Sequence, residues 1–78
     1  MADEQCYNDR LKALGLNVKY YRMKKGLTQK QLAEKLLMSE QQISRIESPN
    51  NEHSTKLDTL FAIADALEID VALLFTFK

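Results

Sequence analysis

Polar side chains with paired hydrogen-bonding groups recur at helical spacing between residues 40 and 48. Ile43 and Ile46 centre the face that such a helix would bury, at about 100° per residue. The opposite face has no apolar residue and holds Gln41, Ser44, Arg45 and Ser48, with Glu40 at its N-terminal edge. A glutamine amide can pair with adenine N6 and N7, and an arginine guanidinium with guanine O6 and N7. A helix with this face turned outward fits a major groove, in which these side chains could contact base edges.

Two of these side chains have a second interpretation. Glu40 could accept a hydrogen bond from a cytosine amine, or it could stabilise the N-terminal end of its helix through the helix dipole. Arg45 could reach a phosphate instead of a guanine. Either alternative leaves the outward face of this helix polar.

A first helix is predicted from an apolar stripe that ends before Gly26. The stripe recurs every three or four residues and comprises Leu11, Leu14, Val18 and Tyr21. Gly26 follows Lys24 and Lys25, a pattern typical of a left-handed helix end. Gly15 inside the stripe costs about 1 kcal/mol relative to alanine, so we expect it to permit close packing against another helix.

Two capping boxes predict the next two helices. Thr28 and Gln31 open the second helix, with Leu32, Ala33 and Leu36 as its buried stripe. Ser39 and Gln42 open the third helix, which buries Ile43 and Ile46 and which Pro49 stops. Two capped helices joined by a short turn form a helix-turn-helix.

The remaining residues predict two more helices, so the expected fold is an all-α domain of five helices around one core. The fourth helix begins at Ser54 or Thr55 and turns inward Leu57, Leu60, Phe61, Ile63, Ala64 and Leu67. Asp70 caps a short last helix, in which Val71, Leu74 and Phe75 pack. The apolar residues of segment 72–77 exceed what one short helix can bury. We expect the surplus to form a symmetric dimer contact through Leu73, Phe75 and Phe77, although Phe77 could instead fold back onto its own core.

Charge is unevenly distributed along the 78 residues, although eleven basic and eleven acidic residues cancel to zero. Residues 1–9 carry −3, residues 10–45 carry +7 and residues 46–78 carry −4. A concentrated basic stretch can attract nucleic acid whatever the total charge is, although it could also simply solvate helix faces. We expect a flexible acidic segment over residues 1–9 and a helix-turn-helix domain over residues 10–78.

No pattern of nucleophile, base or metal ligands is found, so we expect no enzyme, no metal, no cofactor and no small-molecule ligand. His53 is the only histidine and falls in a predicted loop, without an HExxH partner. Cys6 is the only cysteine and cannot form an internal disulfide, which favours the reducing cytoplasm. No apolar run approaches the roughly 18 residues of a membrane span, so no membrane partner is expected.

Residues 14–75 resemble the Xre family, the DNA-binding fold of lambda-type phage repressors and Cro. The matching residues are Leu14, Gly15, Arg22, Gly26, Leu27, Thr28, Gln29, Leu32, Ala33, Ser39, Ile43, Ser44, Ile46, Glu47 and residues 60–67. The resemblance implies a sequence-specific regulator of transcription, expected to be a repressor that binds a palindromic operator in double-stranded DNA as a homodimer. The alternative is an antitoxin or another interaction module of the same fold, whose main partner is a protein.

By its match to the family's pattern, the third helix is expected to contact base edges through Glu40, Gln41 and Arg45, with Ser44 as support. The resemblance also implies roles for residues outside this helix. The family pairs an arginine late in the first helix with a glutamate ending the third, so Arg22 and Glu47 are expected to form a structural ion pair. The family's glutamine at position 29 binds the DNA backbone and braces the start of the third helix, although Gln29 could serve only in capping. The expected phosphate contacts are Gln29, Thr28, Ser39, Ser48, Asn50 and Lys56, with ordinary turn residues as the alternative for the asparagines at 50 and 51.

The turn of the helix-turn-helix departs from the family, which usually has glycine where Leu37 stands. Glycine is also usual at the positions of Pro49 and Glu68. A leucine in left-handed geometry costs roughly 1–2 kcal/mol. We therefore expect either that the turn is reshaped or that burial of the Leu37 side chain offsets this cost.

Overall fold

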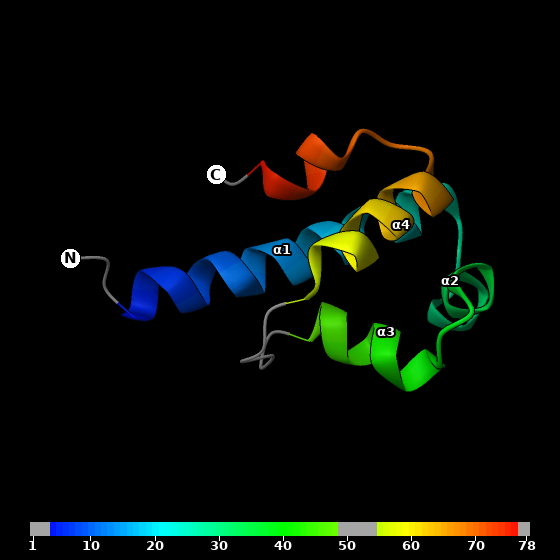
Figure 1. Ribbon diagram of the computed structural model, residues 1–78, viewed down its shortest axis with the longest axis horizontal. Helices are drawn as coiled ribbons and strands as arrows, with labels where there is room; N and C mark the ends of the chain where they lie inside the picture. Colours follow the sequence, from blue (N-terminus) through cyan, green and yellow to red (C-terminus); the bar gives the residue numbers. More distant parts are fainter. Residues whose placement is uncertain (1–3, 49–54, 77–78) are drawn as a thin grey trace.

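The computed structural model describes residues 4–48 and 55–76, which form four α-helices and a 3-10 helix (Figure 1). The helices are α1 (Glu4–Lys25), α2 (Gln29–Leu36), α3 (Glu40–Glu47), α4 (Leu57–Leu67) and the 3-10 helix η1 (Val71–Phe75). No strand occurs within these two ranges. The all-α fold expected from the sequence is therefore confirmed, with a 3-10 helix as its last element.

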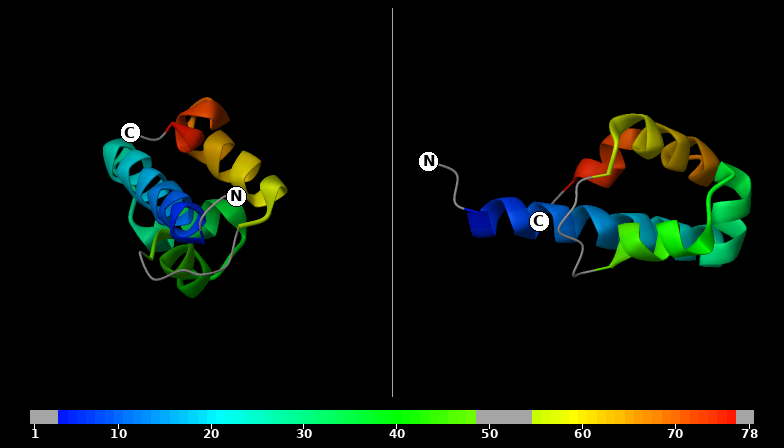
Figure 2. Two further views of the ribbon diagram at one scale, coloured as in Figure 1. Left: turned by 90° about the vertical axis from the view of Figure 1, so that its left-hand side faces the viewer. Right: turned by 60° about the horizontal axis from the view of Figure 1, so that its bottom comes forward.

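The long helix α1 organises the molecule. It packs against α3 along one side and against α4 and η1 along another, while α2 contacts both α3 and α4 (Figure 2). These faces enclose one apolar core. Its buried members are Leu14, Val18, Leu32, Ala33, Ile43, Leu60, Ile63, Ala64, Leu67 and Leu74.

Several helix boundaries differ from the expectation. Helix α1 begins at Glu4 and so runs through much of the segment 1–9, whose flexibility stays a prediction. Helix α4 begins at Leu57, with Lys56 at its N-cap position and no side-chain cap, rather than at Ser54 or Thr55. Pro49 and Ser54 lie outside the described residues.

The buried face of α4 is narrower than predicted. Its core residues recur at i, i+3, i+4 and i+7 from Leu60 to Leu67. Phe61 lies on the flank of this stripe and is 48% exposed, and Leu57, one turn before the stripe, is 58% exposed. In η1, Leu74 is fully buried, whereas Phe75 is 42% exposed because the 3-10 helix turns it away from the core. The prediction that Leu57, Phe61 and Phe75 face inward was therefore wrong.

Three helices end in left-handed residues. Gly26 follows α1 with a φ of 82°, as its position predicts, and Leu37 follows α2 with a φ of 57°. The amide of Met38 donates to the Ala33 carbonyl at 2.9 Å, which holds the turn in a Schellman arrangement. This bonding keeps the left-handed geometry and directs the Leu37 side chain outward, where it is 95% exposed. Both expectations for Leu37, a reshaped turn and burial, were therefore wrong.

Candidate nucleic-acid interface

The outward face of α3 carries the residues that the sequence predicts as base contacts. Glu40, Gln41, Ser44 and Arg45 are all exposed. On the inward face of the same helix, Ile43 is fully buried, Glu47 is 4% exposed and Ile46 is half-buried. The helix lies along the outside of the molecule in Figure 1, so its polar face is accessible to a large partner.

A complete capping box fixes the start of α3. The Ser39 hydroxyl accepts from the Gln42 amide at 3.1 Å, and the Ser39 amide donates to the Gln42 side chain at 2.9 Å. The same box opens α2, where Thr28 and Gln31 exchange hydrogen bonds of 3.0 and 2.8 Å. Each box follows from the spacing of a hydroxyl residue and a glutamine three positions later. Both helix starts are therefore specified by local sequence.

Helix α3 is held close to α1 at Gly15. A methyl group at the Gly15 Cβ position would lie 2.5 Å from the backbone carbonyl oxygen of Ile46. No real Cβ tolerates this distance to a backbone atom, so any larger residue would push α3 away. The prediction that Gly15 permits close packing against another helix is confirmed.

A buried ion pair lies beside this contact. The Arg22 Nε donates to Glu47 Oε2 at 2.7 Å, and Arg22 Nη2 donates to Glu47 Oε1 at 3.0 Å. Arg22 Nη1 also donates to the Leu27 carbonyl at 2.6 Å, so the guanidinium ties the turn after α1 to the end of α3. The two side chains are only 9% and 2% exposed. Two parallel charge-assisted bonds in a low-dielectric setting restrict the orientation of the helix that carries the polar face.

Gln29 joins this network at an unexpected place. Its side-chain amide donates to Glu47 Oε1 at 3.1 Å, so it braces the C-terminal end of α3. The expectation that Gln29 braces the start of α3 was wrong, because the capping box already satisfies that start and the Glu47 carboxylate offers a stronger acceptor. The side chain stays half-buried at the first turn of α2.

The other predicted phosphate contacts lie in different surroundings. Thr28 and Ser39 are exposed N-cap residues, and each uses its side chain in a capping box. Ser48 is half-buried at the end of α3, and Lys56 is exposed at the start of α4. Asn50, like Asn51 and His53, lies outside the described residues.

Cationic side chains near this surface are mostly solvated. Among the residues that the structure describes, Lys25 forms an ion pair on the surface, in which its Nζ lies 3.0 Å from Glu68 Oε1. The hydrogen bond and charge of Lys25 lower the pKa of the Glu68 carboxyl. Since Arg22 is neutralised by Glu47, the exposed positive charge of α1 and α2 comes from the remaining lysines and Arg10.

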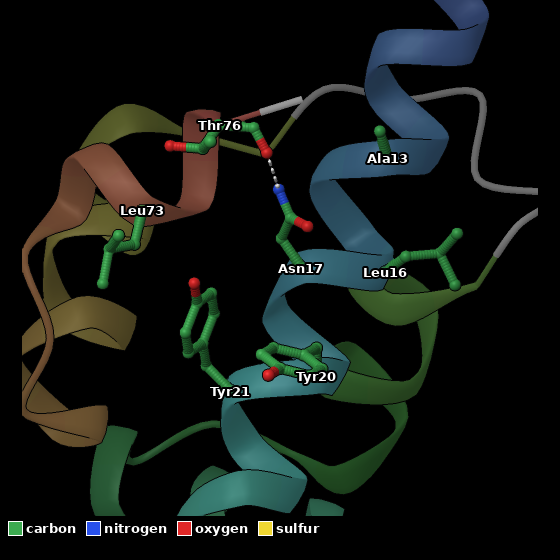
Figure 3. A pocket seen from close by; sticks show the side chains of 7 residues that line it. All are labelled: Ala13, Leu16, Asn17, Tyr20, Tyr21, Leu73 and Thr76. Atoms are coloured by element: carbon green, nitrogen blue, oxygen red, sulfur yellow. Dashed lines mark hydrogen bonds between the residues drawn. The ribbon is translucent and has the colours of Figure 1, made fainter. Parts of the chain in front are cut away.

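An apolar groove between α1 and η1 was not anticipated from the sequence. It has a volume of about 530 Å³ and is lined by Ala13, Leu16, Asn17, Tyr20, Tyr21, Leu73 and Thr76 (Figure 3). Asn17 ties its two walls together, because its side-chain amide donates to the carbonyls of Leu74 at 2.9 Å and Thr76 at 3.1 Å. No local pattern could have revealed a contact between residues so far apart in the chain.

Within residues 4–48 and 55–76, no cluster of histidine, cysteine or acidic side chains has the arrangement of a metal site. None of the helices described is both long and apolar enough to cross a membrane. The described residues present one polar helix face, which the Gly15 contact and the buried pair of Arg22 and Glu47 hold against the rest of the domain.

Together, the order of the helices and the two capped helices α2 and α3 define a lambda-repressor-like helix-turn-helix domain. The helix-turn-helix family model matches residues 18–74. Because this match spans well over half of the chain, the protein belongs to the Cro/C1-type helix-turn-helix family, the Xre family that its sequence resembles. This is a family of DNA-binding regulators that are generally not enzymes. No curated protein matches the chain.

Proposed function

We propose that the protein is a sequence-specific repressor of transcription that binds a palindromic operator as a homodimer, with α3 in the major groove. The observation that carries this proposal is the exposed polar face of α3, oriented by the buried pair of Arg22 and Glu47. A rigidly held helix can align several side chains with base edges at once, which a mobile helix could not do. The single Cys6 fits a protein that works in the reducing cytoplasm.

Specificity is assigned to four side chains of α3. Gln41 suits adenine and Arg45 suits guanine, each through a bidentate contact that contributes about 1–3 kcal/mol of discrimination. Ser44 supports them from the next turn. Glu40 accepts from a cytosine amine or stabilises the start of the helix.

Affinity is assigned to backbone contacts around the two helix starts. The first amides of α2 and α3 have no intrahelical acceptor and favour an anion, with Thr28, Gln29 and Ser39 beside them. Ser48, Asn50 and Lys56 are proposed to hold a second phosphate beyond the end of α3. The Gln29 amide carries a second N–H besides the one donated to Glu47, so it can bind a phosphate while it braces α3.

Dimerisation is assigned to the apolar C-terminal segment. Leu73 is 38% exposed and Phe75 is 42% exposed on η1, and Phe77 follows outside the described residues. Symmetric helix-turn-helix dimers bind two half-sites about 34–36 Å apart, which is the spacing proposed for the operator. Sedimentation at micromolar concentration tests this part, and a monomer both with and without DNA would disprove it.

Selection from a pool of random duplexes tests the DNA assignment. We expect a two-fold symmetric site, with a log affinity that falls by about 0.9 per phosphate neutralised as log salt increases. The variant Gln41→Ala should relax preference at one base position in each half-site. As a control, Lys35→Ala removes an exposed side chain from the far end of α2 and should leave base preference unchanged.

Recovery of no enriched sequence, together with an affinity insensitive to salt, would favour the second candidate. That candidate is an antitoxin or another protein-interaction module, and the observation that supports it is the apolar groove beside α1.

A further inference from the structure

Helix α1 has a second apolar face, turned away from the core. At about 100° per residue, Ala13, Leu16, Tyr20 and Met23 form one line along the helix, which we call the outer stripe. Leu16 is 50% exposed, Tyr20 is 57% exposed and Met23 is 60% exposed. The spacing of three, four and three residues is that of the contact positions of paired helices.

The outer stripe is continuous with the groove between α1 and η1. Ala13, Leu16 and Tyr20 belong to both, and Leu73 forms the opposite wall. In Figure 3, Asn17 and Tyr21 point from α1 toward η1, whereas Leu16 points away from η1. The apolar surface therefore extends from the groove around the exposed side of α1, which suits an elongated ligand that lies along the helix.

Basic side chains flank the outer stripe on both sides. Lys12 and Lys19 lie along one edge, and Arg10 and Lys24 lie along the other, all of them exposed. Lys24 stays close to the stripe, because its Nζ lies 5.9 Å from the centroid of the Tyr20 ring. Between residues 10 and 25 the sequence has no acidic residue, and Asp9 lies at the N-terminal end of the stripe.

This charge pattern decides between the possible occupants. Two copies of the outer stripe facing each other would bring lysines against lysines, in parallel or antiparallel orientation, so a symmetric pairing of two stripes does not fit. DNA offers phosphates but too little apolar surface to cover Leu16, Tyr20 and Met23. A membrane surface would bind the charges but has no feature that fills a groove of about 530 Å³.

We propose that the outer stripe and the adjoining groove bind an amphipathic helix of a protein partner, with its apolar side chains flanked by aspartate and glutamate. The partner's apolar residues cover Leu16, Tyr20 and Met23, and its carboxylates pair with Lys12, Lys19 and Lys24. The surface lies on α1 and leaves the polar face of α3 free. It is therefore independent of the DNA assignment, and the dimer surface assigned to η1 shares Leu73 with it.

A pair of synthetic helical peptides tests the proposal with the full chain. Both peptides contain three heptads with leucine at the two contact positions, and one has glutamate at the flanking positions where the other has lysine. Titration followed by fluorescence anisotropy should show the glutamate peptide binding at least about tenfold more tightly than the lysine peptide. Equal binding of the two peptides, or no binding of either, would overturn the proposal.

Variants locate the binding surface. The double variant Leu16→Gln/Met23→Gln should weaken binding of the glutamate peptide by about tenfold or more. The control Leu37→Gln removes a 95% exposed leucine outside the stripe and should leave binding unchanged. Likewise Lys19→Glu should weaken binding of the glutamate peptide. The control Lys30→Glu reverses the charge of an exposed lysine on α2 and should leave binding unchanged. An equal loss in the control variants would overturn the assignment to this surface.

Four further measurements separate the alternatives. Thermal unfolding and DNA affinity of the double variant should match the parent protein, so a failure here is distinguishable from a failure of the DNA proposal. A change in the double variant's self-association would identify the stripe as a contact between copies and overturn the proposal. Binding of anionic phosphatidylserine vesicles as tightly as the glutamate peptide would overturn it in favour of a lipid surface.

Discussion

Helix α3 is fastened to α1 by a close backbone approach and a buried ion pair, whereas α2 and α4 end in strained, exposed residues. At the α1–α3 contact, Gly15 leaves no room for a methyl group, and the Arg22–Glu47 pair is almost completely buried. At the two helix ends, Leu37 and Glu68 adopt φ values of 57° and 59°. The residue after each of them donates its backbone amide to a carbonyl five residues earlier, Met38 to Ala33 at 2.9 Å and Ile69 to Ala64 at 3.0 Å.

The difference shows where the chain needs an accurate fit. The α1–α3 contact sets the angle of the helix with the polar face, and a small shift there would misplace every side chain on it. The helix ends need only stop a helix, and backbone hydrogen bonds do this even with leucine or glutamate in the left-handed position, at a small cost in strain. We therefore expect substitutions to be costly at the first region and neutral or favourable at the second.

The largest effect is expected from breaking the buried ion pair. The variant Arg22→Met leaves the Glu47 carboxylate buried with only the Gln29 amide as a partner, so the free energy of unfolding should fall by about 3–5 kcal/mol. Urea denaturation followed by circular dichroism measures this loss.

The double variant Arg22→Met/Glu47→Met provides the control for the charge. Since it leaves no uncompensated charge in the core, it should recover much of the stability lost in the single variant. If the double variant is as unstable as the single variant, the loss reflects packing of the arginine side chain rather than the buried carboxylate.

A smaller loss is expected from adding a methyl group at the backbone contact. Gly15→Ala gains about 1 kcal/mol in helix propensity, but displacement of α3 should cost more, for a net loss of up to about 3 kcal/mol. Amide chemical shifts measured by NMR should move at Ile46 and Glu47, since these residues meet the new methyl group.

Gly26→Ala is the matched glycine substitution. An added Cβ at Gly26 meets nothing within 4 Å, but the residue has a φ of 82°. Its cost should therefore come only from backbone strain, and its shift changes should stay around the turn after α1. Shifts at Ile46 and Glu47 in the Gly26 variant as large as in the Gly15 variant would remove the distinction between close packing and strain.

A gain in stability is expected at the turn of the helix-turn-helix. Leu37→Gly relieves the left-handed strain and removes an exposed apolar side chain, so the free energy of unfolding should rise by about 1 kcal/mol. Leu37→Ala serves as the control, because it shortens the side chain but keeps the Cβ and its strain. A gain of equal size in both variants would attribute the effect to the exposed side chain instead of the backbone.

The sequence predicted the features that depend on nearby residues. The capping boxes of α2 and α3 follow from hydroxyl and glutamine residues three positions apart, and Gly26 ends α1 as expected. The close approach at Gly15 was predicted from the cost of a glycine inside a helix. The capping boxes and the end of α1 have their cause within one or two helical turns, whereas Gly15 indicated a close contact without identifying Ile46 as the partner.

The features that were missed depend on contacts between distant segments. Periodicity identified the buried stripe of α4 but not its width, so Leu57 and Phe61 were placed inside. The groove beside α1 depends on Asn17 bonding to the carbonyls of Leu74 and Thr76, which no local pattern reveals. The contacts of Gln41, Arg45 and their neighbours with bases stay predictions, because they require a partner as well as a fold.

The smallest effect is expected at the end of α4, where Lys25 and Glu68 form an exposed pair. Hydrogen bonding to Lys25 lowers the pKa of Glu68 in the folded protein, so the pair stabilises the fold above the usual carboxyl pKa. This contribution is lost as pH falls through the lowered pKa, because protonated Glu68 no longer attracts Lys25. Thermal unfolding of the parent and of Lys25→Gln should therefore differ slightly at neutral pH and low salt, and the difference should shrink in acid and in high salt. As a control, Lys30→Gln replaces an exposed lysine on α2 and should show no such pH dependence. If the difference between the parent and Lys25→Gln persists in acid, Lys25 acts through the end of α1 and not through Glu68.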